Sequence, residues 1–133
     1  HLAGANLPLG VTLDPVNNQF LVTDSTGNRV LIVDPQNVKF VQNIATGINP
    51  TSIAYNYQAT EAVTANEASH TASFIEISPS GSQVRALILA NASAQQSVAI
   101  DPLTNLVLVV DQANNRLLLI PSPHCSHTMR SPL

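Results

Sequence analysis

Three short stretches near the start of the chain decide the fold: Val11-Thr12-Leu13-Asp14-Pro15, Leu21-Val22-Thr23-Asp24 and Gly27-Asn28-Arg29-Val30-Leu31-Ile32-Val33. They recur, in the same order, as Val98-Ala99-Ile100-Asp101-Pro102, Leu108-Val109-Val110-Asp111 and Asn114-Asn115-Arg116-Leu117-Leu118-Leu119-Ile120. All three recurrences keep one offset of 87 residues, as in 98 minus 11. A constant offset over such a distance indicates an internal structural repeat.

A weaker copy lies halfway between the two strong ones. Pro50 to Tyr55 matches Pro8 to Leu13 at an offset of 42 residues (50 minus 8), whereas Phe74 to Pro79 matches Val30 to Pro35 at an offset of 44 (74 minus 30). This drift predicts two extra residues between Asn66 and Ser73, in a longer turn that includes Glu67 and His70. The offset of 87 is therefore two units of about 43 residues, which is the length of a propeller blade repeat.

Each unit contains four short apolar runs separated by turn-forming residues. In the first unit we expect strands at 11–14, 19–23, 29–34 and 39–44, because Asp-Pro, Asn-Asn and Gly-Asn pairs interrupt the apolar runs. Four antiparallel strands in a meander make one blade of a β-propeller. The predicted blades cover about 8–44, 50–89 and 95–121, followed by a tail at 122–133.

The pattern Pro-x-Gly-Val-x-x-Asp, then Val-x-Asp-x-x-x-Asn-Arg-Val, resembles the NHL repeat. The resemblance covers most of residues 8–121 and is strong in blades one and three. Blade two departs from it, since it lacks the Asp-Pro turn and the arginine. The resemblance implies an all-β chain made of blades of a six- or seven-bladed propeller.

Both ends of the chain predict an incomplete ring. Residues 1–8 align with residues 43–50, the end of an outer strand, and residues 121–127 contain too many turn formers to supply a fourth strand to blade three. An open arc of three blades would expose two apolar faces, which a monomer rarely tolerates. Two interpretations stay open: a fragment whose remaining blades belong to a longer chain, or a half-ring whose self-association closes six blades with two-fold symmetry.

Composition excludes several classes of protein. Hydrophobic residues make up 44% of the chain and charged residues 10%, with a formal net charge of -3. The acidic balance argues against a nucleic-acid partner, and the longest apolar runs are far shorter than a membrane span, which needs roughly 20 residues. The single cysteine, Cys125, forms no internal disulfide. One lysine and the glycosylation sequon at Asn91 favour an exported protein, periplasmic or extracellular, and leave the compartment open.

The candidate ligand-binding residues lie in the turns after the second strand of each blade. The turn from Asn66 to Thr71 departs from the repeat and carries Glu67 and His70, and departures from a repeat are where binding loops are added. Asp24 and Asp111 each precede an arginine by five residues, and we interpret both mainly as scaffold groups that cap the following turn. The full set of candidate ligand-binding residues is Asn66, Glu67, His70, Asp24, Asn28, Asp111 and Asn114.

No catalytic or metal-binding residues are predicted. The cluster His124-Cys125-Ser126-His127 offers borderline metal ligands, but it lacks a second ligand pair, so we expect a tail without a metal. Asp14-Pro15 and Asp101-Pro102 are predicted to form turns.

Two function classes follow from the sequence. The first is a non-enzymatic binding or scaffold module that presents its rim loops to a protein or a small ligand, with no cofactor. The second, implied by resemblance to six-bladed lactonases, esterases and lyases, is part of an enzyme with a divalent metal on the propeller axis, whose site would lie largely in other blades. Thr51, Gln95 and Gln96, at the starts of the inner strands, are not the carboxylates and histidines that such a site needs.

Overall fold

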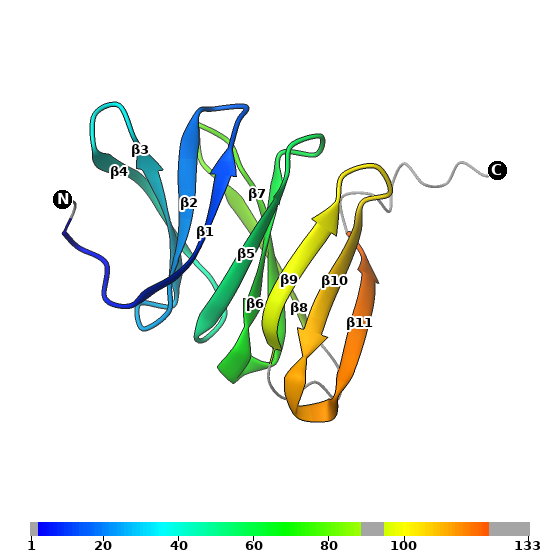
Figure 1. Ribbon diagram of the computed structural model, residues 1–133. Coiled ribbons are helices and arrows are strands. Elements are labelled where there is room, and N and C mark those ends of the chain that lie inside the picture. The colour runs from blue at the N-terminus through cyan, green and yellow to red at the C-terminus, as the bar shows by residue number, and fades with distance from the viewer. Residues whose placement is uncertain (1–2, 89–94, 123–133) are drawn as a thin grey trace.

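The computed structural model describes residues 3–88 and 95–122 and consists of three antiparallel β-sheets (Figure 1). The sheets stand side by side in chain order, and each is a simple meander in which consecutive strands pair. The first sheet contains β1 (Pro8–Asp14), β2 (Gln19–Asp24), β3 (Arg29–Asp34) and β4 (Lys39–Ala45). The second contains β5 (Pro50–Asn56), β6 (Glu61–Asn66), β7 (Thr71–Glu76) and β8 (Gln83–Ile88). The third contains β9 (Gln95–Asp101), β10 (Leu106–Asp111) and β11 (Arg116–Pro121).

Two one-turn 3₁₀ helices, η1 (Glu67–Ser69) and η2 (Gln112–Asn114), form the β6–β7 and β10–β11 turns. The prediction of four-stranded antiparallel meanders, the last with three strands in the described residues, is confirmed. No helix among the described residues is long and apolar enough to cross a membrane.

The turns between the first two strands of each blade are closed by one side chain. A carboxylate or amide oxygen accepts a hydrogen bond from the backbone N–H two residues further on, at 2.9 Å from Asp14 to Val16, 3.0 Å from Asn56 to Gln58 and 3.0 Å from Asp101 to Leu103. This is the turn that Asp and Asn favour, so the predicted role of Asp14 and Asp101 is confirmed. Blade two reaches the same geometry with asparagine.

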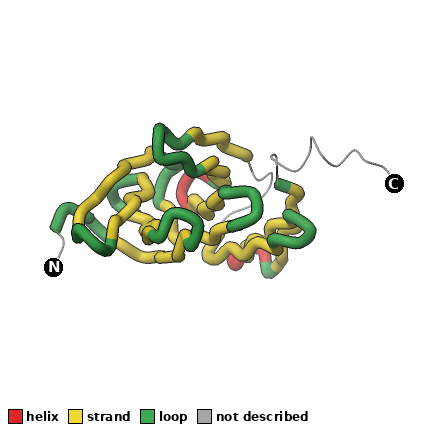
Figure 2. Tube along the Cα trace, turned by 90° about the horizontal axis from the view of Figure 1, so that it is seen from above, coloured by secondary structure: helices red, strands yellow, loops and turns green. Residues whose placement is uncertain are grey.

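The sheets pack face to face through alternate side chains. On β6, Ala62 faces the first sheet in one apolar cluster and Val63 faces the third sheet in another, and both are fully buried. Every residue of β6 is buried, which requires neighbours on both faces. Seen from above, the three sheets form one continuous stack (Figure 2). The middle sheet thus shows how a blade of this chain buries its faces.

The predicted extra residues in the β6–β7 turn are not there. Asn66 pairs with Thr71 across this turn just as Asp24 pairs with Arg29 in the first blade, so the two turns have equal length. The extension lies instead between β7 and β8, where Glu76 pairs with Gln83, seven positions on, whereas Asp34 pairs with Lys39, five positions on. A shift of two residues preserves the in-out alternation of a strand, so the apolar pattern alone does not reveal which turn carries the extension.

Phe74 offers the sharpest test of this packing, because it lies at the centre of the interface between the second and third sheets and is 1% exposed. Phe74→Ala removes its buried ring and leaves a cavity, which costs about 3–5 kcal/mol. We expect that loss in the free energy of unfolding, measured by urea titration with circular dichroism. Leu103→Ala, at a residue that is 82% exposed, is the control and should change it by less than about 0.5 kcal/mol. Equal effects would contradict the packing.

Candidate functional site

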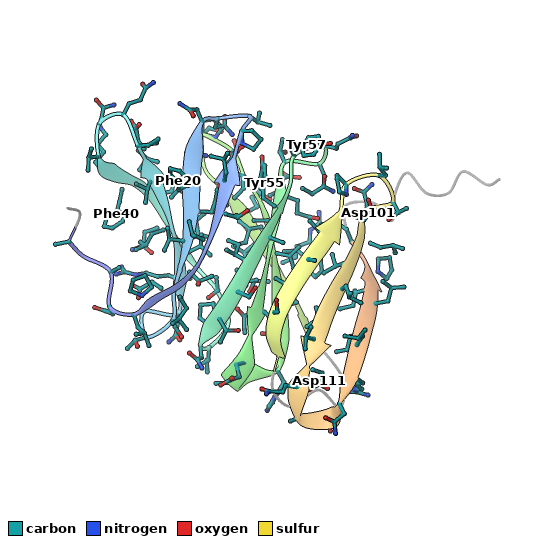
Figure 3. All side chains as sticks on the ribbon, in the orientation of Figure 1. Phe20, Phe40, Tyr55, Tyr57, Asp101 and Asp111 are labelled. Carbon is teal, nitrogen blue, oxygen red and sulfur yellow. The ribbon has the colours of Figure 1, made fainter. Side chains whose placement is uncertain are left out.

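The seven candidate residues lie in the turns at one edge of the sheets, opposite to the edge formed by Asp14 and Asp101. Figure 3 shows this separation for Asp111 and Asp101, which lie at opposite ends of β10 and β9. The three turns at this edge are 24–29, 66–71 and 111–116.

Asp24 holds the first turn together. It is fully buried, and its Oδ1 accepts hydrogen bonds from the backbone N–H groups of Asn6 and Leu7, both at 2.9 Å. Its Oδ2 accepts one from Arg29 Nε at 2.8 Å. Burial by itself raises the pKa of Asp24, but the N–H of Leu7 and the Arg29 guanidinium outweigh it and hold this pKa below its ordinary value. Asp24 therefore fixes the chain that enters β1.

The same position is filled differently in the other two blades. Asp111 is also fully buried, and its Oδ2 accepts from Arg116 Nε at 3.0 Å and from Asn114 Nδ2 at 2.8 Å. In blade two, Asn66 replaces the aspartate, and its Nδ2 donates to Thr71 Oγ1 at 3.0 Å and to Ser73 Oγ at 2.9 Å. A neutral amide with hydroxyl partners thus takes the place of an ion pair.

Asn28 and Glu67 belong to neighbouring turns and meet at a shared residue. Asn28 Oδ1 accepts a hydrogen bond from the N–H of Asn49 at 2.9 Å, and Glu67 Oε1 accepts one from Asn49 Nδ2 at 3.2 Å. His70 ends η1 in the left-handed conformation, with φ 56°, and its side chain is exposed. The structure therefore brings the turns of blades one and two together, with His70 facing solvent.

The hydrogen bonds described above join most of the candidate residues to the scaffold, and the role of these residues in binding a ligand stays a prediction. Within residues 3–88 and 95–122, no group of three or more His, Cys, Asp or Glu side chains lies close enough together to hold a metal ion. The sequon at Asn91 and the cluster at His124, Cys125 and His127 lie outside the described residues.

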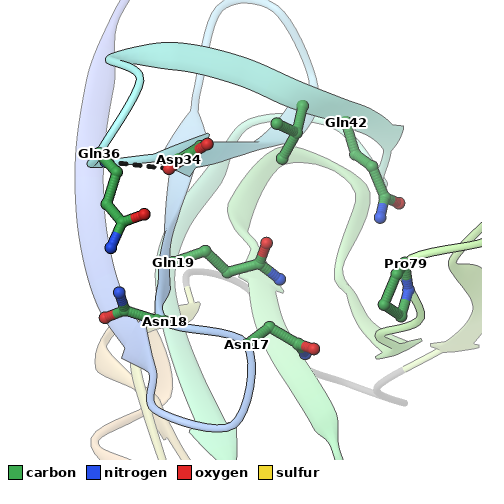
Figure 4. Close-up of a pocket in the computed structure, with 8 residues that line it drawn as sticks. Asn17, Asn18, Gln19, Asp34, Gln36, Gln42 and Pro79 are labelled. Carbon is green, nitrogen blue, oxygen red and sulfur yellow. Dashed lines mark hydrogen bonds between the residues drawn. The ribbon is translucent and has the colours of Figure 1, made fainter.

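A groove at the opposite edge was not predicted. It lies between the first and second sheets and has a volume of about 520 Å³. Its walls come from the β1–β2 and β3–β4 turns, from β4 and from the extended β7–β8 turn (Figure 4). The eight residues that line it are Asn17, Asn18, Gln19, Asp34, Gln36, Val41, Gln42 and Pro79.

Two features of the sequence relate to this groove, although neither was interpreted as part of a binding site. Asn17 and Asn18 were predicted to form a turn and Gln19 to begin the second strand, as they do, and all three residues also line the groove. The two-residue extension was assigned to the β6–β7 turn, although it belongs to the β7–β8 turn that contributes Pro79. The two extra residues of the second blade therefore lie at the edge of the sheets that contains the groove.

Comparisons with known proteins define the class of fold. No family model and no curated protein matches the sequence. Among solved structures, the chain is similar to a chain in the crystal structure of the mitotic checkpoint complex, with a TM-score of 0.76 and 15% identity over 85% of this chain and 35% of that chain. It is also similar to virginiamycin B lyase from Staphylococcus aureus, with a TM-score of 0.65 and 16% identity over 89% of this chain and 43% of that one.

A third similar structure is Kuenenia stuttgartiensis hydrazine synthase, with a TM-score of 0.66 and 15% identity over 92% of this chain and 38% of that chain. The checkpoint-complex and lyase neighbours have propeller-like folds, so the chain is a set of β-propeller blades. It spans about 35–43% of the length of these three solved chains.

The charge on Asp24 can be tested through its pH dependence. The pKa of Asp24 is lower in the folded state than in the unfolded chain, so unfolding takes up a proton at low pH. The contribution of the Asp24 carboxylate to the free energy of unfolding is therefore lost as the pH falls below about 4. We expect Asp24→Asn to lower the free energy of unfolding by about 1–3 kcal/mol at pH 7 and by less at pH 3, in urea titrations at both pH values.

The second blade supplies a matched variant for this test. Asp24→Asn combined with Arg29→Thr copies the Asn66 and Thr71 pair and should recover part of the loss at pH 7. If Asp24→Asn lowers the stability equally at both pH values, its carboxylate charge is not the source of the effect.

Proposed function

We propose that this chain is a non-enzymatic binding and scaffold segment of a β-propeller, whose two end faces bind further blades and whose turns contact a ligand or a protein. One observation carries the proposal. Apolar positions that are buried between neighbouring sheets are exposed where they recur at the two ends of the stack.

The end face of the third sheet shows this directly. Leu108, Leu117 and Leu119 occupy the repeat positions of Leu21, Val30 and Ile32, 87 residues earlier (108 minus 21). The three earlier residues are 0% exposed against the second sheet, whereas the three leucines are 37%, 64% and 64% exposed. We therefore expect another apolar surface to cover this end face.

The opposite end face, on the first sheet, carries the complementary set. Val11 and Phe20 recur as Val98 and Val107, again at an offset of 87. Val98 and Val107 are buried against the second sheet, whereas Val11 is 63% exposed and Phe20 39%. Its further exposed members are Leu9 and Leu13.

The internal interfaces identify what would cover these faces. Each interface joins two faces: the face of one blade that points toward the following blade, which we call the trailing face, and the face of that following blade that points back, which we call the leading face. In the first interface, Leu21 and Val30 on the trailing face pack against Ile53 and Ala62 on the leading face. The third sheet exposes a trailing face and the first sheet a leading face of the same kind. Each buried side chain of this type contributes roughly 1.5–3 kcal/mol, so a further blade, in the same chain or in a second copy, is a partner of matching chemistry.

The similar solved structures include two enzymes by name, hydrazine synthase and virginiamycin B lyase, and one protein assembly, so the comparisons support the enzyme and the scaffold interpretation equally. The similar lyase has the same kind of fold, but a shared fold does not fix an activity. The propeller in the checkpoint complex is part of a protein assembly by its name, which agrees with a scaffold role. We therefore keep the enzyme as the alternative that metal analysis and activity assays of the complete ring would reveal.

Self-association of the purified chain tests the end faces. We expect light scattering to give a mass near twice 14.1 kDa, because two arcs joined leading face to trailing face close a ring. Leu117→Glu on the trailing face and Val11→Lys on the leading face should each shift the mass toward one chain. Mixing the two variants should restore the dimer, since one interface is then free of substitutions and the other pairs opposite charges.

Leu103→Glu is the control, because this exposed leucine lies in the β9–β10 turn, outside either end face. It should leave the mass unchanged. A folded wild-type chain that stays monomeric at its highest soluble concentration would overturn the coverage of the end faces by a second copy, and a dimer that Leu117→Glu and Val11→Lys leave intact would overturn the end faces as the contact surfaces.

A further inference from the structure

The groove between the first two sheets does not depend on what covers the end faces. All eight of its lining residues belong to β1–β4 and the β7–β8 turn or to the turns between them. Its volume of about 520 Å³ lies within the range of small-molecule sites, roughly 300–1,000 Å³. Its lining is nevertheless unlike that of most such sites, which are predominantly apolar.

Amide side chains dominate the lining. Five of the eight residues are asparagine or glutamine, and Asp34 is the single charged residue among the eight. An amide group both donates and accepts hydrogen bonds, as a hydroxyl group does. Without a lining lysine or arginine, the groove has no counter-charge for a phosphate or a carboxylate. The chemistry thus matches a neutral ligand with many hydroxyl groups.

Several of these amides are held in place by the fold. Asp14 Oδ2 accepts hydrogen bonds from Asn17 Nδ2 at 2.8 Å and from Gln19 Nε2 at 3.0 Å. Each bond uses one of the two N–H groups of the amide nitrogen, which leaves one N–H donor and the carbonyl oxygen of Asn17 and of Gln19 for a ligand. Side chains that are already ordered lose less entropy when a ligand binds.

The extended β7–β8 turn fixes a third amide from the opposite wall. Gln42 Nε2 donates to the backbone oxygen of Ser78 at 2.8 Å, and Ser82 Oγ donates to Gln42 Oε1 at 2.8 Å. The extension that breaks the repeat thus both supplies Pro79 to the groove and orients Gln42. Pro79 and Val41 add apolar surface suited to the C–H faces of a sugar ring.

The equivalent place in the next interface shows that such a groove is not a by-product of blade packing. There, Glu61, Glu76 and Arg85 occupy the strand positions of Gln19, Asp34 and Gln42, as the strand pairings show. Together with Phe74 and Gln83 they enclose only about 20 Å³. Neutral amides around an open space are thus specific to the first interface.

We infer that the groove lined by Asn17, Asn18, Gln19, Asp34, Gln36 and Gln42 is a binding site for a neutral oligosaccharide. The inference rests on the proposed binding role in its general form and names its ligand class. Asn18 and Gln36 line the groove from the β1–β2 and β3–β4 turns of the first sheet (Figure 4), and they are the residues to test.

The test uses the full 133-residue chain and four neutral probes: maltotriose, cellotriose, mannotriose and N,N′,N″-triacetylchitotriose. We expect at least one to bind in calorimetry and to shift the side-chain amide resonances of Asn17, Gln19 and Gln42. The double variant Asn18→Gly, Gln36→Ala removes two side-chain amides that make no hydrogen bond within residues 3–88 and 95–122. Glycine is used because Asn18 has a φ of 53°. The double variant should weaken binding at least tenfold.

Asn115→Gly combined with Gln58→Ala is the matched control, since Asn115 has a φ of 51° and both amides are exposed outside the groove. It should bind like the wild type, and both double variants should unfold at the wild-type temperature. Absence of binding to all four probes, unchanged binding by the groove variant, or selective binding of an unstructured peptide instead would overturn the inference. The dimer mass is measured separately, so failure here leaves the end-face proposal standing, and the reverse also holds.

Discussion

The structure depends on one constraint: every sheet has two apolar faces, and each must be covered by a neighbour. A strand sends alternate side chains to opposite faces, so the apolar run in β6 places Ala62 and Val63 in two different clusters. The middle sheet satisfies the constraint on both sides. The outer sheets satisfy it on one side only, and this imbalance, rather than any catalytic group, is the property on which the proposed scaffold role is built.

The fold was predictable because its signal is redundant. The offset of 87 residues links three separate stretches, and the Asp-Pro and Gly-Asn turns mark strand ends independently of the apolar pattern. Where only one signal was present, the prediction failed. Blade two lacks the Asp-Pro turn and the arginine, so Phe74 was aligned with Val30 although the pairings place it opposite Ile32. The error of two residues was invisible to the alternation, because both alignments put the phenylalanine on the same face.

The candidate sites were harder to predict, since residue type does not reveal what a side chain is bonded to. Asp24 and Asp111 each pair with an arginine five residues further on. Asn66, at the same repeat position, instead donates hydrogen bonds to Thr71 and Ser73. The groove illustrates the opposite case. Gln19 and Gln42 look like ordinary surface glutamines in the sequence, and only the packing of two sheets brings them to the walls of one space.

The double coverage of β6 also has a dynamic consequence. In a stack in which each sheet contacts only its neighbours, local opening begins at the ends, and the centre opens last. The groove straddles the junction of an end sheet with the central one, so each departure of the first sheet would dismantle it. A ligand bound in the groove would contact both sheets, so it would suppress these opening events and slow amide hydrogen exchange in β1 to β4. Occupancy of the groove and rigidity of that end of the stack are thus thermodynamically linked, each favouring the other.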